Sequence, residues 1–194
     1  MSLPDRLRLP LAFDAAALAR DLESLGASEW IAHFVTQNYD GDWSVIPLRA
    51  DARATHPIKM IYSDPTATAF VDTPMLAGRP AFRAVLASLR CETRAVRLMR
   101  LTAGSVIKEH DDGDLDAARG VARLHLPITT NVGVVFELNR RPVAMAPGEL
   151  WYLRLSDPHR VANRGDTDRV HLVIDVVVND WLNDLLARAA AAAG

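Results

Sequence analysis

Residues 123–153 read RLHLPITTNVGVVFELNRRPVAMAPGELWYL, and this run carries the clearest fold signal in the chain. It contains four short segments rich in β-forming residues, namely Arg123–Thr129, Val134–Leu138, Val143–Met145 and Leu150–Leu153. Turn-forming residues separate them at Asn131, Asn139-Arg140 and Pro147-Gly148. Many short strands at regular spacing are typical of a β-sandwich or a small barrel.

The same pattern continues on both sides of this run. Ala95–Leu101 precedes it and Val170–Val178 follows it, each with the composition of a strand. We therefore predict a mainly β fold with flanking helices, whose jelly-roll-like core covers residues 91–180. A closing helix is expected over residues 181–194, and the whole of residues 1–194 is expected to form a single domain.

The first 90 residues have a different texture, and we predict a helical or irregular N-terminal elaboration that packs on the barrel. Asp14–Leu25 and Pro80–Leu89 have helical character. Tyr39–Asp42 reads as a hairpin turn, since it contains Asp40-Gly41. Ala50–Pro65 is polar and contains prolines, which favours an ordered loop.

Composition excludes several classes of function. Hydrophobic residues make up 49% and charged residues 24%, which excludes a disordered chain. The formal net charge of −2 gives no sign of a nucleic-acid partner. A single cysteine, Cys91, excludes an intramolecular disulfide and a cysteine-rich zinc site, and fits a cytoplasmic location. No apolar run is long enough to predict a membrane span, and no signal peptide is apparent.

Three side chains have the chemistry and spacing of a metal site. His110 and Asp112 lie two residues apart, so in an extended segment they point to the same side. His159 follows several strands later, which is enough chain to return beside them. Two imidazoles and one carboxylate form the facial triad of non-haem iron sites. The alternative is a surface histidine beside an aspartate in a turn.

Arg169 begins the apolar strand that includes Val170–Val178, where an unpaired charge would be costly. A carboxylate is its best partner, either that of a ligand or that of Asp166 or Asp168 nearby. Arg123 and His125 lie two residues apart and share one face of their strand, which is either the inside or the outside of the barrel. The sequence leaves the same two orientations open for Arg97.

Five blocks of sequence resemble the aspartyl/asparaginyl β-hydroxylase family in order and spacing, over about Arg94 to Val178. They are Gly104–Asp112, Arg123–Ile128, Pro147–Trp151, His159–Asn163 and Arg169–Asp175. The resemblance implies a double-stranded β-helix, which is a jelly roll of the cupin type. It also implies an oxygenase that uses Fe(II), 2-oxoglutarate and O2, hydroxylates an amino acid, acylated amino acid or peptide side chain, and releases succinate and CO2.

The resemblance also implies roles for individual residues. His110, Asp112 and His159 would bind iron, and Arg169 would pair with the C5 carboxylate of 2-oxoglutarate. Arg123 and His125 would line the pocket for cosubstrate and substrate. The animal enzyme that names the family lacks the carboxylate ligand. Because Asp112 is present here, the chain is more similar to the bacterial proline hydroxylases, and the named enzyme's substrate does not transfer.

Substrate recognition is expected from Arg97 and from the aromatic and polar stretch that contains His33, Tyr39 and Trp43. The surplus of arginines favours an anionic small molecule or peptide as the substrate. Packing of the N-terminal segment on the barrel is the alternative explanation for the aromatic residues. The alternative function is a cupin-type metalloprotein: an isomerase, a dioxygenase without 2-oxoglutarate, or a binding protein without catalysis. The sequence carries no signal for the oligomeric state.

Overall fold

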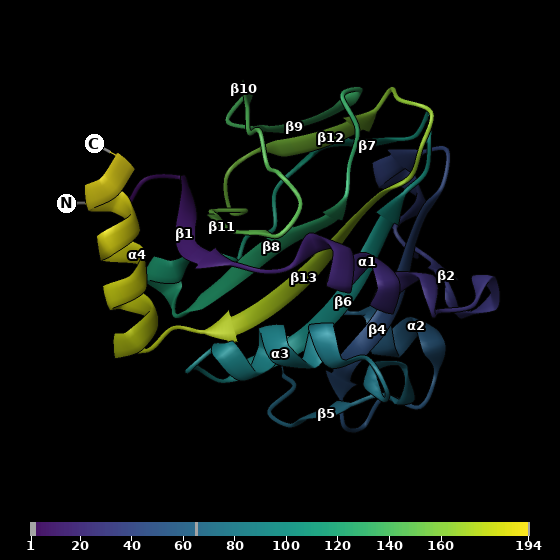
Figure 1. Ribbon diagram of the computed structural model, residues 1–194, viewed down its shortest axis with the longest axis horizontal. Helices are drawn as coiled ribbons and strands as arrows, with labels where there is room; N and C mark the ends of the chain where they lie inside the picture. The colour runs from purple at the N-terminus through teal and green to yellow at the C-terminus, as the bar shows by residue number, and fades with distance from the viewer. Residues whose placement is uncertain (1–2, 65, 194) are drawn as a thin grey trace.

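Strand β13 (Arg169–Val177) shows how the fold is built. Its even-numbered residues from Val170 to Val176 enter the main hydrophobic core, whereas Arg169, His171 and Asp175 point to the opposite face. The computed structural model describes residues 3–64 and 66–193. Within them the chain forms two antiparallel sheets with helices on the outside (Figure 1).

The larger sheet has the order β1-β11-β8-β13-β6-β4-β2, with β5 paired to β4. Its strands other than β13 are β1 (Arg6–Ala12), β2 (Ile31–Ala32), β4 (Trp43–Asp51), β5 (Phe70–Asp72), β6 (Thr93–Leu101), β8 (Val121–Thr129) and β11 (Glu149–Leu153). The smaller sheet has the order β10-β9-β12-β7-β3. Its strands are β3 (Tyr39–Asp40), β7 (Val106–His110), β9 (Val134–Leu138), β10 (Arg141–Pro142) and β12 (His159–Asn163).

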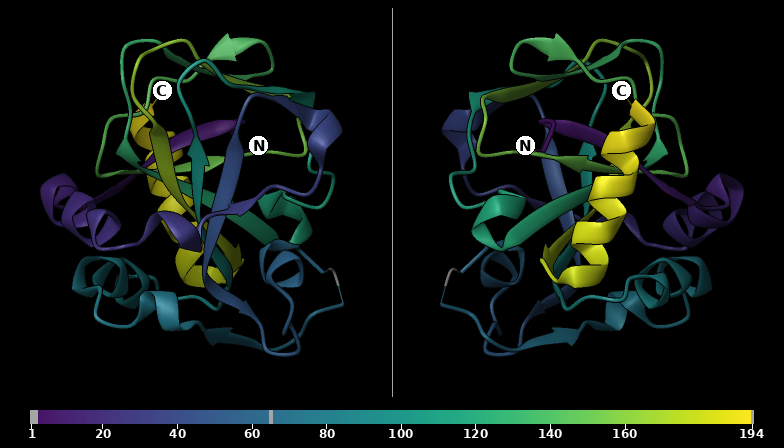
Figure 2. Two further views of the ribbon diagram at one scale, coloured as in Figure 1. Left: turned by 90° about the vertical axis from the view of Figure 1, so that its right-hand side faces the viewer. Right: turned by 90° about the vertical axis from the view of Figure 1, so that its left-hand side faces the viewer.

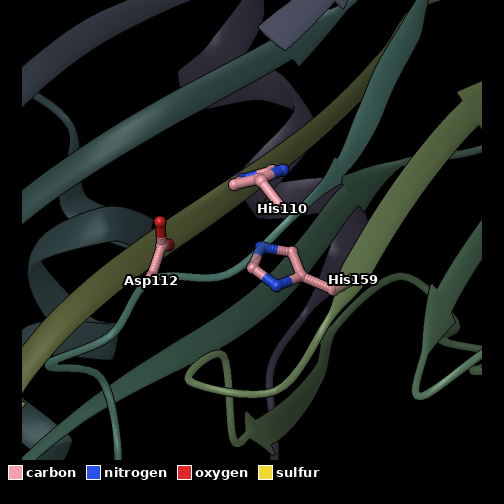
Figure 3. A group of neighbouring side chains, drawn as sticks. All are labelled: His110, Asp112 and His159. Atoms are coloured by element: carbon pink, nitrogen blue, oxygen red, sulfur yellow. The ribbon is translucent and has the colours of Figure 1, made fainter.

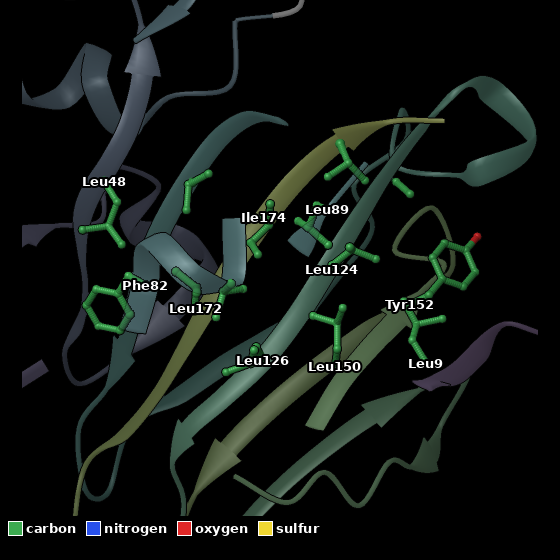
Figure 4. Close-up of a cluster of buried hydrophobic side chains, with 14 of the residues drawn as sticks. Leu9, Leu48, Phe82, Leu89, Leu124, Leu126, Leu150, Tyr152, Leu172 and Ile174 are labelled. Atoms are coloured by element: carbon green, nitrogen blue, oxygen red, sulfur yellow. The ribbon is translucent and has the colours of Figure 1, made fainter. Parts of the chain in front are cut away.

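Two hydrophobic clusters lie on the two faces of the larger sheet. The first packs the sheet against helices α1 (Ala15–Glu23), α3 (Pro80–Ser88) and α4 (Asp180–Ala193). Figure 4 shows part of it, with Phe82 of α3 beside strand residues such as Leu48 and Leu172. The second, smaller cluster lies between the two sheets. Polar side chains share that inter-sheet space with it, so the site is enclosed between the sheets.

Helices α1, α3 and α4 pack on the face of the larger sheet that is turned away from the smaller sheet. α4 lies on the outside of the fold and packs against β1 (Figure 2). A short helix, α2 (Pro57–Ile61), packs against β4. Among the described residues, no helix is long and apolar enough to cross a membrane.

Much of the predicted architecture is confirmed. The two facing sheets with flanking helices form the expected jelly roll. The segments predicted around β6, β8, β9, β11 and β13 are strands, and the regions predicted as helices contain α1, α3 and α4. Gly194 and Pro65, at the ends of two predicted segments, lie outside the described residues.

The expectation that residues 1–90 form a helical or irregular segment is wrong, because this region contains several strands. β4 lies inside the larger sheet beside β6 and is almost entirely buried. Pro47 falls within it at a register shift, and a proline in a run argues against a strand when only sequence is considered. β1 pairs with β11, and its alternation of Leu7 and Leu9 with arginines is an ordinary half-buried pattern.

The predicted hairpin turn at Tyr39–Asp42 is also wrong. β3 pairs with β7 in the smaller sheet, whereas β4 pairs with β6 in the larger one, so Gly41 carries the chain from one sheet to the other. Gly41 has φ +88°, and a Cβ there would lie 2.2 Å from the Oγ of Ser105. Only glycine combines this conformation with so close an approach.

Two smaller segments differ from expectation. A strand is expected at Val143–Met145, but the strand in this region is β10, which comes immediately before those residues. It follows directly on a tight turn formed by Asn139 and Arg140, whose φ angles are positive, at 51° and 60°. Such a two-residue turn fixes the register with β9, and Val143, which follows β10, still donates its N–H to the carbonyl of Phe136 at 2.8 Å. The loop predicted over Ala50–Pro65 contains the end of β4 and helix α2.

Candidate functional site

A cavity of about 740 Å³ opens between the two sheets. Strands of both sheets supply its walls, and the segments around residues 33–38, 61–64 and 112–121 border it. It contains nearly all of the site residues expected from the sequence: His110, Asp112, His159, Arg169, Arg123, His125, Arg97, His33 and Trp43 line it, whereas Tyr39 does not. The site therefore lies where the polar faces of β6, β8 and β13 meet the smaller sheet.

His110, Asp112 and His159 come together at one end of the smaller sheet (Figure 3). His110 ends β7 and His159 begins β12, and the two residues are direct partners across the antiparallel pair. One ligand atom from each of the three side chains lies within 4.8 Å of the others. Strand pairing thus closes the 49-residue separation between the two histidines, as the sequence spacing predicted.

Backbone carbonyls orient both imidazoles. The Nδ1 of His110 lies 2.7 Å from the carbonyl oxygen of Lys108, and the Nδ1 of His159 lies 3.0 Å from that of Asp157. A carbonyl only accepts, so each Nδ1 donates and Nε2 is the ring nitrogen left for a metal ion. Burial, followed by the charge of His110, lowers the pKa of His159. Binding of a metal ion requires each Nε2 to be free of a proton.

Asp112 faces the cavity, and Asp111 is exposed. The alternation predicted from sequence therefore holds, although β7 itself ends at His110. The backbone N–H of Asp112 donates to the carbonyl of Leu155 at 2.8 Å, which fixes the turn. Its Oδ2 accepts from Nη1 of Arg123 at 2.9 Å. One carboxylate oxygen is thus held by the protein, and the other is left for a ligand.

Arg123 and Arg97 share one carboxylate inside the protein, that of Asp175. Arg123 donates to Asp175 through Nε at 2.6 Å and through Nη2 at 3.0 Å. Arg97 donates to Asp175 through Nη1 at 3.0 Å, and its Nη2 donates to the hydroxyl of Ser63 at 2.8 Å. Burial alone raises the pKa of Asp175, but the two guanidinium groups lower it to about 2. The guanidinium of Arg123 is therefore engaged by two carboxylates.

Arg169 has a different environment. Its side chain is 2% exposed, and no carboxylate of the described residues lies within ion-pair distance. Asp168 instead faces Arg100 at 3.9 Å, so the local ion pair considered for Arg169 does not form. Its Nη2 contacts the Nδ1 of His171 at 2.8 Å, and its Nε is buried without an acceptor. Burial lowers the pKa of Arg169 to about 9.

His125 and His171 lie beside this guanidinium as neutral imidazoles. Burial, followed by the charge of Arg169, holds the pKa of each well below its ordinary value. Their Nδ1 atoms are 3.4 Å apart, and the Nε2 of His125 is buried without a partner in the described chain. His171 is buried against Arg169.

Aromatic rings form one wall of the cavity. His33 stacks on Trp43, with ring centroids 3.6 Å apart, and on its other side stacks on Phe34 at 4.9 Å. Tyr39 packs edge-on against Trp43, and its hydroxyl donates to the carbonyl of His33 at 3.1 Å. The structure therefore gives Tyr39 the packing role that was the alternative explanation, and leaves His33 and Trp43 on the cavity wall.

Sequence reasoning missed four residues of the site. Asp175 was quoted only as the end of a strand, Ser63 lay in a predicted loop, and Phe34 and Tyr62 were not chosen. Phe34 carried a usable signal because it adjoins the predicted site residue His33. Tyr62 follows α2, an element that was not predicted, so nothing in the sequence marked Tyr62 as a residue of the site.

Comparisons with known proteins match the part of the chain that carries this site. The family model described as Aspartyl/Asparaginyl beta-hydroxylase matches residues 13–178, which extends beyond the five sequence blocks into the N-terminal half. L-proline cis-4-hydroxylase of Rhizobium meliloti (strain 1021) is 28% identical over 165 residues, which are 84% of this chain and 57% of that protein. The chain thus spans somewhat more than half the length of this curated relative.

Solved structures share the fold at low identity. A prolyl-4-hydroxylase from Pseudomonas putida superposes with a TM-score of 0.56 at 13% identity, covering 90% of this chain and 93% of that one. A member of the 2OG-Fe(II) oxygenase family from Burkholderia pseudomallei gives a TM-score of 0.53 at 19% identity, covering 89% and 85%. These two likenesses establish the jelly-roll fold.

Proposed function

Because the chain belongs to the aspartyl/asparaginyl β-hydroxylase family, we propose that it is an Fe(II)- and 2-oxoglutarate-dependent oxygenase. It hydroxylates an amino acid, an acylated amino acid or a peptide side chain, with succinate and CO2 as co-products. The family match bears out the resemblance read from the sequence blocks. The proposal for the activity rests on the contents of the cavity.

The observation that carries the proposal is the pairing of two features in one cavity. One is the His110, Asp112 and His159 triad, and the other is Arg169, a buried guanidinium without a carboxylate partner among the described residues. Two imidazoles and a carboxylate fit Fe(II) and leave further coordination positions open. A dicarboxylic oxo acid suits both features, because one end can bind a metal and the other can pair with Arg169.

The protein's own groups have definite tasks in this proposal. The Nε2 atoms of His110 and His159 and the free oxygen of Asp112 would hold the metal. With 2-oxoglutarate and O2, bound iron supplies the oxidising chemistry for hydroxylation of a C–H bond. Arg169 would bind the distal carboxylate of the cosubstrate and thereby fix its orientation. Neutral His125 and His171 keep the surroundings of Arg169 polar without adding positive charge.

The other arginines support the site rather than bind the cosubstrate's distal end. Arg123 holds Asp112 in place through the 2.9 Å contact and is itself held by Asp175. Metal-binding carboxylates are commonly oriented by hydrogen bonds of this kind. Arg97 completes the ion-pair network and lines the cavity as a fully buried residue.

The test is an anaerobic titration of the metal-free protein with Fe(II) and then with 2-oxoglutarate, followed by visible absorption. We expect a metal-to-ligand charge-transfer band that requires both components. The band should be absent in His159→Ala, which removes one triad member. It should persist in His56→Ala, a matched control at an exposed histidine outside the cavity.

Each other outcome is informative. Tight iron binding without a band would favour the alternative, a cupin-type metalloenzyme that does not use 2-oxoglutarate. A band of full strength in His159→Ala would disprove the triad assignment. Succinate formation that depends on 2-oxoglutarate and O2, measured with candidate substrates, then tests for turnover.

A further inference from the structure

Four rings form a continuous row along the cavity wall, and we call Trp43, His33, Phe34 and Tyr62 the aromatic row. Trp43 and His33 are nearly parallel at 7°, and His33 and Phe34 are at 16°. Phe34 and Tyr62 meet edge to face, with centroids 5.7 Å apart. All four line the cavity that contains the triad. The row therefore joins elements far apart in the sequence into one apolar surface.

The row runs from the interior to solvent. Trp43 is buried, whereas Phe34 is 38% exposed and Tyr62 is 48% exposed. Among the described residues, only two other large hydrophobic side chains are exposed, Val71 and Val132. Stacking within the row leaves the outer rings uncovered at the cavity mouth. Apolar surface exposed at the mouth of a polar site is typical of a binding surface.

Trp43 anchors the inner end of this surface. Its side chain is buried, and its indole nitrogen is covered by the protein itself, so it offers a ligand the face of its ring and no hydrogen bond. The row thus fits an apolar ring of a ligand.

The charge of the cavity defines the rest of the ligand. Five arginines and four aspartates line it in the part of the chain that the structure describes, which leaves one excess positive charge. A divalent metal ion and doubly charged 2-oxoglutarate cancel one another. A substrate with a single negative charge is therefore complementary. A free neutral amino acid carries an ammonium group as well as its carboxylate, and acylation of the nitrogen removes that positive charge.

We propose, resting on the function proposed above, that the substrate is an N-acylated amino acid with an aromatic acyl group. The acyl ring lies on the aromatic row, and the carboxylate balances the excess positive charge of the cavity. The volume of about 740 Å³ agrees with a ligand larger than a free amino acid beside the cosubstrate.

The experiment is isothermal titration calorimetry on the full chain loaded with Mn(II) and 2-oxoglutarate without O2. The probes are L-leucine, L-proline and L-aspartate, each as the free amino acid, the N-acetyl form and the N-benzoyl form. We expect at least one N-benzoyl form to bind about ten-fold more tightly than its N-acetyl form, and the free amino acids to bind most weakly.

Three variants locate the preference. Phe34→Ala and Tyr62→Ala should each weaken binding of the N-benzoyl probe about three- to ten-fold and leave binding of the N-acetyl probe nearly unchanged. Val132→Ala truncates a more exposed apolar side chain outside the cavity and should change neither. Because Phe34 and Tyr62 are partly exposed, we expect both variants to fold, and thermal unfolding checks this.

The proposal is overturned if the free amino acids bind as tightly as the N-benzoyl forms, if no probe binds, or if both alanine variants bind N-benzoyl probes like the wild type. The function proposed above fails separately, when 2-oxoglutarate does not bind the metal-loaded protein in the same calorimeter before any probe is added. A normal 2-oxoglutarate isotherm without a benzoyl preference therefore rejects the substrate class alone.

Discussion

Two regions of the same cavity treat buried arginines in opposite ways. At one, Arg97 and Arg123 share the carboxylate of Asp175, and Arg123 also holds Asp112. At the other, Arg169 is as deeply buried but has only the neutral imidazole of His171 as a side-chain partner among the described residues. All three arginines lie on adjacent strands of the larger sheet.

The difference separates structural charge from charge available to a ligand. Burying a guanidinium without a counter-ion lowers the free energy of unfolding, so a fold that tolerates one gains something from it. Asp166 and Asp168 lie close in sequence but do not pair with it. The paired region has its counter-ions within the protein, whereas in the proposed function the carboxylate of the cosubstrate supplies the counter-ion of Arg169.

Asp175→Asn gives the largest expected effect, because it removes the carboxylate that two buried arginines share. Breaking a buried ion pair from one side costs about 3–5 kcal/mol, since it leaves uncompensated buried charge. We expect a loss of this size in the free energy of unfolding, measured with urea on the metal-free protein. Asp72→Asn, in a surface pair with Arg49, should cost about 1 kcal/mol or less. Equal losses in both variants would show that the network is not structural.

Arg169→Leu should affect binding and stability in opposite directions. It removes the charge proposed to hold the distal carboxylate, so binding of 2-oxoglutarate should weaken roughly 100- to 1,000-fold in calorimetry. The free energy of unfolding should stay equal or rise, because the charge had no ion-pair partner in the described chain. Arg160→Leu, at an exposed arginine, serves as the control for binding. Destabilisation with unchanged binding would make Arg169 a structural residue.

The contrast between the two regions also explains what the sequence could predict. The position of Arg169 at the start of an apolar strand was visible, as was the two-residue alternation of His110 and Asp112. Both are local patterns. The pairing of Arg123 with Asp175 depends on strand register between β8 and β13, where the two residues are direct partners. Register between distant strands is not contained in either segment alone.

The N-terminal half shows the same limit. The helices α1 and α3 follow from local periodicity, but β4 contains Pro47 and is buried on both faces, so it lacks the alternation that marks a half-exposed strand. Once β4 was missed, the aromatic row could not be assembled, because Trp43 begins that strand. The candidate metal ligands were predictable, whereas the substrate wall required the fold.

Ser63→Ala tests whether the paired arginines depend on carboxylates or on any hydrogen-bond acceptor. The hydroxyl of Ser63 accepts from Arg97 at 2.8 Å and from Arg123 at 3.4 Å, but Ser63 itself is exposed. Because water can replace the hydroxyl and Asp175 already balances the charge, we expect a loss of only about 0.5–1 kcal/mol in the free energy of unfolding. A loss near that of Asp175→Asn would place the main support of the network in the segment after α2.

The two regions should also begin to lose stability at different pH values as the solution is acidified. His125 and His171 have folded-state pKa values well below 6.5, chiefly through burial and then through the charge of Arg169. Below pH 6.5 the unfolded chain therefore binds more protons than the folded one, and stability falls as the pH is lowered. Asp175 has a folded-state pKa of about 2, against 3.8 for the ordinary group, so its contribution is lost only as the pH falls from about 3.8 towards 2.

His171→Asn should separate these two contributions in urea unfolding of the metal-free protein. The variant should lose stability less steeply as the pH falls below 6.5, because one imidazole that must stay neutral is gone, while the further loss that Asp175 contributes should still begin near pH 3.8. Part of the wild-type slope should remain above pH 4, since His33 has a folded-state pKa of about 4 for the same reason of burial. A variant slope that changes only below pH 3.8 would contradict the assignment of the neutral, acid-sensitive groups to the Arg169 region.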